Sequence, residues 1–167
     1  MADVLGLLAI SMFTFSVAVF GLGTDSLGLI VAIGQFAGAV TLIVAVIAYL
    51  NENLLGTAIF GPLAIFFFTI VSIVGVSAAM LCVAIGIIIL IDALVAVAQP
   101  VRLLPILLII AAIAFFVTAL WYNGSSDLKS AMGALWMIYS LISFYMAAAI
   151  MLLVMKGKQV LPLMIKT

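Results

Sequence analysis

The chain has 167 residues, of which 70% are hydrophobic and 6% charged, and its 5 basic residues balance its 5 acidic ones. Soluble globular domains have roughly 45–50% apolar and about 25% charged residues, so a water-soluble fold of this composition could not cover its surface with polar groups. The formal net charge of zero also gives no excess of basic residues of the kind that nucleic-acid-binding proteins carry. We therefore expect an integral membrane protein that is embedded in the lipid bilayer and binds no nucleic acid.

Apolar stretches follow one another along the whole chain, separated by short polar turns. A membrane-spanning helix needs about 20 mainly apolar residues, and lipid requires every backbone polar group to be paired within the protein, which favours helices. We predict an all-α, multi-pass membrane protein with a single transmembrane domain over residues 1–167, a six-transmembrane-helix bundle. The expected helices cover residues 4–22, 27–50, 54–74, 78–98, 103–121 and 131–155.

The basic residues predict how this bundle is oriented. With six helices, both termini share one side of the membrane with the turns at 51–53 and 99–102. That side carries Arg102, Lys156, Lys158 and Lys166, whereas the other side carries only Lys129. Because basic residues favour the cytoplasmic side, we expect both termini in the cytoplasm, in an inner or plasma membrane.

The sequence contains no recognisable catalytic set. It has no histidine, and its single cysteine, Cys82, lies in an apolar stretch. Most carboxylates fall in predicted turns, and neither a metal-ligand cluster nor a phosphate-binding glycine loop is visible. We expect no enzymatic activity, no metal and no cofactor.

The polar groups within the predicted spans are therefore the candidates for function. Gln35 lies at membrane depth between Gly34 and Gly38, a spacing that lets a neighbouring helix approach closely. Its amide either bonds to another helix or lines a solute pathway, since it cannot face lipid cheaply. Ser11 and Thr14 share a helix face and either line the same pathway or bond to carbonyls of their own helix.

Two further features interrupt the apolar pattern. Gly61 and Pro62 lie inside the predicted third helix, where proline removes one hydrogen bond. They make either a packing kink or a helix break beside the conduction path, with the Thr57 hydroxyl nearby. Asp92 is the carboxylate furthest inside a predicted span, and it either pairs with Arg102 at the cytoplasmic edge or relays a proton.

Several segments, in the same order, resemble the acetate uptake transporter family, the succinate–acetate permeases. The first is Leu5-Gly6-Leu7 followed by Thr14, although the family's preceding Asn-Pro is replaced here by Ala2-Asp3-Val4. The others are Gln35 to Gly38, the run from Asn53 to Phe60 with Phe66, Val101-Arg102-Leu103-Leu104, and Val160-Leu161-Pro162.

This resemblance implies a six-helix protomer with its own conduction path, assembled as a hexamer. It also implies passage of acetate or a similar small monocarboxylate, coupled to a proton. The family narrows its path with a Phe, a Tyr and a Leu, and the positions matched to these here are Ile10, Leu63 and Ala111. None keeps the family residue, so the resemblance implies a constriction of different width and polarity.

A weaker resemblance links Phe60-Gly61-Pro62 and Phe36-Ala37-Gly38 to the urea and amide channel family, which also forms six-helix protomers in hexameric rings. Acid gating through histidine cannot occur here, because the chain has none. The sequence thus favours a small-solute channel or transporter for acetate or a related acid. The alternatives are a channel for urea or short amides and, in another class, a non-transporting membrane scaffold or accessory subunit.

Overall fold

The computed structural model describes residues 2–164, and every long element among them is an α-helix. The helices are α1 (Ala2–Gly21), α2 (Leu27–Leu50), α3 (Leu54–Ile70), α4 (Gly75–Ala96), α5 (Leu103–Tyr122) and α6 (Lys129–Lys156), with a short 3-10 helix, η1 (Ser126–Leu128), before α6. The predicted order and number of long helices are therefore confirmed. Lys166, which contributed to the orientation argument, lies outside the described residues.

The largest difference from the predicted boundaries lies between α3 and α4. α3 ends at Ile70 rather than at residue 74, and α4 begins at Gly75 rather than at residue 78. The backbone N–H of Ser72 donates to the carbonyl of Thr69 at 3.0 Å, which closes a tight turn after α3. Gly75 then takes a left-handed conformation with φ of 60°, which glycine adopts at little cost.

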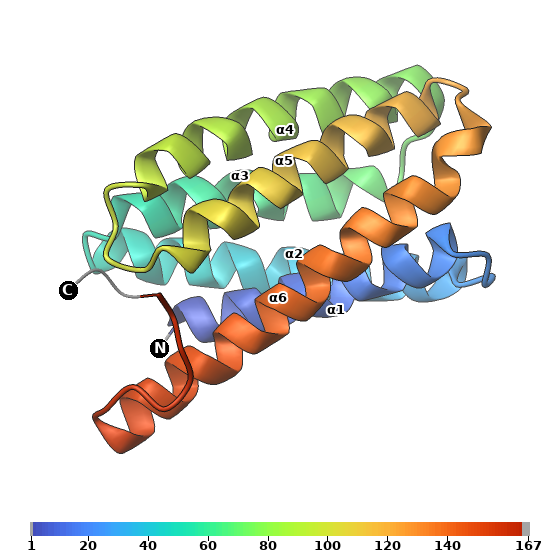
Figure 1. Ribbon diagram of the computed structural model, residues 1–167. Helices are drawn as coiled ribbons and strands as arrows, with labels where there is room; N and C mark the ends of the chain where they lie inside the picture. Colours follow the sequence, from blue (N-terminus) through green and yellow to red (C-terminus); the bar gives the residue numbers. More distant parts are fainter. Residues whose placement is uncertain (1, 165–167) are drawn as a thin grey trace.

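The six helices form a closed ring in chain order. Each packs against its neighbours in the sequence, and α6 closes the ring by packing along α1. Figure 1 shows this arrangement, with the start of α1, the described C-terminal tail and the α2–α3 and α4–α5 connections at the same end of the bundle. A ring of this kind encloses a central axis, and the cavities described below lie on it.

Small residues set the closest helix contacts in the ring. Gly21 of α1 and Gly133 of α6 lie back to back, and a Cβ added at Gly133 would come within 2.7 Å of the Gly21 carbonyl carbon. On α2, Gly34 and Gly38 face α3, where added Cβ atoms would meet Val71 at 2.7 Å and the Phe68 ring at 3.0 Å. The Gly34-to-Gly38 spacing therefore serves packing within the chain.

The outer surface of the ring is apolar. Phe36 is 75% exposed and Met80 is 68% exposed, and patches of this kind on a bundle surface are typical of contact with lipid. Five of the helices are long and apolar enough to cross a bilayer, and α3 is a shorter apolar helix of 17 residues. The chain is thus a multi-pass helical membrane protein.

Candidate functional site

Three cavities lie in a row along the axis of the ring. We call them the Asp3 cavity, of about 190 Å³, the central cavity, of about 10 Å³, and the Trp121 cavity, of about 210 Å³. Ile10, Leu108 and Tyr139 line both the Asp3 cavity and the central cavity. Phe13, Phe66 and Trp136 line both the central cavity and the Trp121 cavity. The three cavities therefore form one interrupted path through the protomer.

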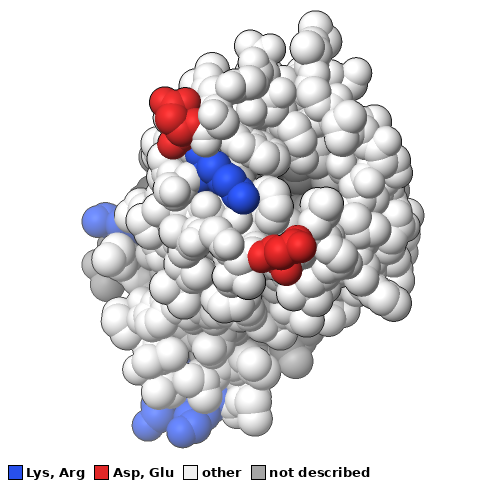
Figure 2. All heavy atoms as spheres, turned by 90° about the vertical axis from the view of Figure 1, so that its right-hand side faces the viewer, with Lys and Arg blue, Asp and Glu red and all other residues white. Residues whose placement is uncertain are grey.

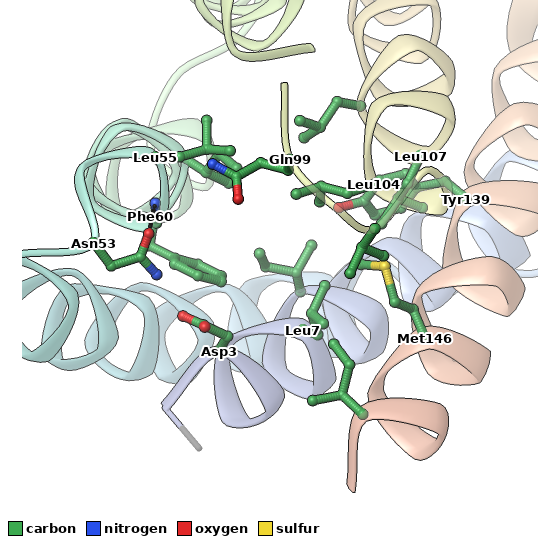
Figure 3. Close-up of a pocket in the computed structure, with 16 residues that line it drawn as sticks. Asp3, Leu7, Asn53, Leu55, Phe60, Gln99, Leu104, Leu107, Tyr139 and Met146 are labelled. Atoms are coloured by element: carbon green, nitrogen blue, oxygen red, sulfur yellow. Dashed lines mark hydrogen bonds between the residues drawn. The ribbon is translucent and has the colours of Figure 1, made fainter. Parts of the chain in front are cut away.

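The Asp3 cavity lies at the end of the bundle that holds the start of α1 and the described C-terminal tail. Asp3 from α1, Asn53 from the turn before α3 and Gln99 from the loop after α4 are polar residues of its lining, and Tyr139 of α6 adds a phenol hydroxyl. Figure 3 shows the polar ends of the first three of these side chains on one side of the cavity and the apolar Leu104 and Met146 on the other. Asn53 is held in place because its side-chain oxygen accepts the backbone N–H of Gly56 at 3.0 Å, an N-cap of α3.

The central cavity is the narrowest part of the path. A volume of about 10 Å³ is at or below the roughly 10–15 Å³ that one water molecule needs. Every helix except α2 contributes to its walls. The lining residues are Ile10, Phe13, Thr14, Leu63, Phe66, Phe67, Ile89, Leu108, Ala111, Phe115, Trp136 and Tyr139. Since none of these side chains is charged, the centre of the path is a dry, uncharged neck.

Aromatic rings that pack edge to face form much of the wall of the neck. The ring centroids of Phe66 and Phe115 lie 5.0 Å apart at an angle of 89°, and those of Phe115 and Trp136 lie 4.9 Å apart at 87°. These edge-to-face arrangements are the favoured geometry for aromatic pairs. They fix the positions of large side chains from α3, α5 and α6 around the same point.

The Trp121 cavity lies at the opposite end and is bordered by aromatic side chains. Phe20 and Trp121 make an edge-to-face contact at 5.8 Å between ring centroids, and Tyr122 packs beside Trp121. Deeper in the cavity, the indole N–H of Trp136 donates to Oγ1 of Thr118 at 2.9 Å, and the Thr118 hydroxyl donates to the Ala114 carbonyl at 2.7 Å. The lining of this cavity carries no charged residue.

The three residues matched to the family constriction lie together in the structure. Ile10, Leu63 and Ala111 come from α1, α3 and α5, are at most 3% exposed, and all line the central cavity. Thr14 lines it too. The Thr14 hydroxyl donates to the Ile10 carbonyl at 2.9 Å or to the Ser11 carbonyl at 3.2 Å, which leaves its oxygen free to accept a bond from a solute.

Ser11 lies elsewhere, in the contact between α1 and α6. Its hydroxyl donates to the Leu7 carbonyl of its own helix at 2.6 Å. From α6, Ser140 donates to the Ser11 carbonyl at 3.1 Å, and Ser143 donates to the Leu7 carbonyl at 3.4 Å. These serines join two helices through backbone carbonyls and line none of the three cavities, so the pathway role expected for Ser11 is not supported by its position.

Gln35 and Thr57 also lie away from the three cavities. Gln35 is exposed on the outer face of α2, because Gly34 and Gly38 turn their side of the helix towards α3. The Thr57 hydroxyl donates to the Asn53 carbonyl one turn earlier in its own helix at 3.0 Å. The expectation that these two side chains line the path is therefore corrected: α2 and the start of α3 turn them away from it.

The expected helix break at Gly61 and Pro62 is not present. α3 runs without interruption from Leu54 to Ile70 with Pro62 inside it. No side chain presses against Gly61, since a Cβ added there would meet nothing within 4 Å. Of the two interpretations of this motif, a proline accommodated by packing is the one that agrees with the structure.

Asp92 is buried inside α4. It is 5% exposed, and its Oδ2 atom has no hydrogen-bond partner. No ion pair joins it to Arg102, so the expected pairing is absent between these two described residues. Asp92 follows Ile89 by three residues and therefore shares its helix face, and Ile89 lines the central cavity.

Two parts of the path were missed from the sequence. In the sequence, the aromatic residues of the neck cannot be told from other apolar residues, because the chain is apolar nearly throughout. They include Phe13, Phe66 and Phe115. The bond between Thr118 and Trp136 joins residues 18 positions apart in two helices. A threonine one turn from the end of α5 was the only local signal, and it does not reveal which helix faces it.

The chain matches no family model and no curated protein in sequence. Its fold is similar to that of a solved structure described as the bacterial acetate channel SatP, with a TM-score of 0.90, 20% sequence identity and coverage of 97% of both chains. The protein therefore has the fold of that acetate channel over nearly its whole length.

Proposed function

We propose that this protein is a membrane channel for a small solute, and that acetate or a similar small monocarboxylate is the solute. The observation that carries the proposal is the row of three cavities inside a closed ring of helices. Packing alone does not require two chambers of about 190 and 210 Å³ that meet at the same neck, since protein interiors contain few voids larger than a water molecule. The fold shared with an acetate channel supports the choice of solute.

The neck favours the neutral form of such an acid. Its walls are apolar or aromatic except for Thr14 and the polar ends of Trp136 and Tyr139. An anion would have to shed its hydration shell with no cation to replace it, which costs far more than desolvating the protonated acid. Hydrophobic constrictions control passage in this way by excluding water. Ile10, Leu63 and Ala111 form the constriction, and Thr14 offers a hydrogen-bond acceptor to the acid proton.

Uptake of labelled acetate by proteoliposomes tests this mechanism. We expect faster initial uptake at pH 5 than at pH 8, because a larger share of the acid is protonated at the lower pH. Protein-free liposomes correct for passive diffusion, which has the same pH trend. Protein-dependent uptake that is equal at the two pH values would contradict passage of the neutral acid.

Asp92 is the candidate for proton coupling. Its buried carboxyl group, with an unpartnered Oδ2 atom, shares a face of α4 with Ile89 at the neck. A carboxyl group in this position can exchange a proton without moving its helix. We infer that Asp92 accepts and releases a proton beside the constriction.

The assembly and orientation follow from the resemblance and from the charges. We propose a ring of six protomers in an inner or plasma membrane, each protomer with its own path, and both termini in the cytoplasm. Gln35 supports contact between protomers, because its amide lies exposed on α2 at a depth where lipid offers no hydrogen bond. Gln35→Leu is expected to weaken assembly, measured by native mass spectrometry, while acetate flux per protomer stays unchanged.

Urea or a short amide is the alternative solute. The observation that favours it is the uncharged neck, since a neutral amide enters such a neck as readily as a neutral acid does. The side-chain amides of Asn53 and Gln99 in the Asp3 cavity can bond to an amide solute. Stopped-flow swelling with urea and with acetate separates the two solutes, and flux of neither would favour the scaffold alternative.

A further inference from the structure

Lys129 lies beside the Trp121 cavity, next to one of the aromatic side chains that line it. It is the first residue of α6, and its Nζ atom lies 4.1 Å from the centroid of the Phe20 ring. Phe20 itself lines the Trp121 cavity. A cation over an aromatic face is attracted by the ring quadrupole. This contact holds a half-buried ammonium group at the edge of the chamber.

Lys129 is also the one basic residue at its end of the bundle within the described chain. The connections there, residues 22–26, 71–74 and 123–128, contain Asp25 and Asp127 but no Lys or Arg. Both aspartates are exposed, whereas Lys129 is half-buried. Figure 2 looks onto this end and shows a basic side chain lying between acidic ones, with further basic side chains only at the left and lower margins of the view.

The stability of α6 does not account for a lysine at this position. The N-terminus of a helix carries partial positive charge, so a cation in the first turn is unfavourable and a carboxylate is preferred there. Among the described residues, Lys129 has no carboxylate partner in an ion pair to offset this effect, and its charged end rests on Phe20. The contact with Phe20 holds the lysine at this position, and its charge is left for a group outside the helix.

We propose that Lys129 is the residue that gathers the carboxylate anion beside the Trp121 cavity. This inference rests on the proposed function, because it requires the solute to be an acid. The lining of the cavity carries no charged residue, and its apolar walls strengthen the field of a cation placed beside it. The ammonium group speeds the arrival of the anion, which is the abundant form near neutral pH. The anion then takes up a proton from solution at this position, and the neutral acid enters the neck.

The test compares Lys129→Met with Lys129→Arg in proteoliposomes, with labelled acetate and labelled urea as probes. Methionine keeps an apolar stem on Phe20 without the charge, and arginine restores the charge. Lys156→Gln is the matched control, because Lys156 is an exposed cation at the opposite end of α6. Circular dichroism and gel filtration of each detergent-purified variant check that it is folded. Uptake is measured at about 0.01 M and about 1 M salt, where the screening lengths are about 30 and 3 Å.

We expect Lys129→Met to lower initial acetate uptake about tenfold at low salt, the lower end of the range for electrostatic steering. The variant and the wild type should converge at high salt, urea uptake should not respond, and Lys156→Gln should behave as wild type. Equal acetate uptake by wild type and Lys129→Met at low salt overturns the inference, as does a loss that salt and urea share. Absence of acetate uptake by the wild-type protein would instead overturn the proposed function itself.

Discussion

The indole nitrogen of Trp136 lies 2.9 Å from Oγ1 of Thr118, and this bond ties α6 to α5 between the neck and the Trp121 cavity. Thr118→Val keeps the shape of the side chain but leaves the buried indole N–H without an acceptor. An unsatisfied buried donor costs about 1–3 kcal/mol, so we expect a lower melting temperature in detergent. Thr118→Ser keeps the acceptor and serves as the control. Equal melting temperatures of Thr118→Val and the wild type would show that the indole N–H finds another acceptor.

Ala111 is the smallest of the residues proposed to form the constriction. Ala111→Leu adds three carbon atoms beside a cavity of about 10 Å³, so we expect acetate flux to fall at least tenfold while the protein remains folded. Ala39→Leu, on the exposed face of α2, adds the same volume away from the path and should leave flux unchanged. Flux that is insensitive to Ala111→Leu would place the conduction path elsewhere.

Shortening Leu63, another constriction residue, should widen the neck rather than block it. Leu63→Ala removes three carbon atoms from the same wall, and we expect it to raise the uptake of longer monocarboxylates relative to acetate. The measurement is competition between acetate and butyrate for uptake by proteoliposomes. An unchanged preference between the two acids would count against Leu63 as a determinant of selectivity.

Asp92→Asn tests proton coupling with little change of shape. An amide cannot exchange a proton as a carboxyl group does, so we expect the ratio of protein-dependent acetate uptake at pH 5 to that at pH 8 to fall. The pH dependence that comes from the solute itself should remain. Glu52→Gln, an exposed substitution in the turn before α3, is the control. If Asp92→Asn keeps the wild-type ratio, Asp92 has no part in coupling.

A substitution of Gly133 tests the contact between α1 and α6 that closes the ring of helices. Any side chain at this position would press on the backbone of α1, because an added Cβ would lie 2.7 Å from the Gly21 carbonyl carbon and 2.8 Å from the Leu22 nitrogen. Overpacking of this kind costs about 1–3 kcal/mol, so Gly133→Leu should lower the melting temperature. Gly28→Leu meets no atom within 4 Å of its Cβ and should be tolerated. Equal melting of the two variants would mean that α1 and α6 separate easily.

Much of the architecture could be predicted from the sequence because a bilayer imposes strict local rules. Length and hydropathy predicted six apolar helices, since a span must cross the thickness of lipid with its backbone paired. The boundary between α3 and α4 was the weakest prediction, because only the three residues 75–77 were taken as their connection. The turn there depends on Gly75 and on a bond from Ser72 to Thr69.

The side of each helix that faces the path was decided only by the tertiary structure. In a soluble protein the polar face of a helix marks its outside, but here lipid and the neighbouring helices are both apolar, so the sequence pattern carries almost no rotational information. Polarity alone placed Gln35, Thr57 and Ser11 on the path, yet helix packing turned Gln35 outward and left both hydroxyls bonded to carbonyls of their own helices. The aromatic neck came from the same packing, which brought Phe13, Phe66 and Phe115 together from three helices.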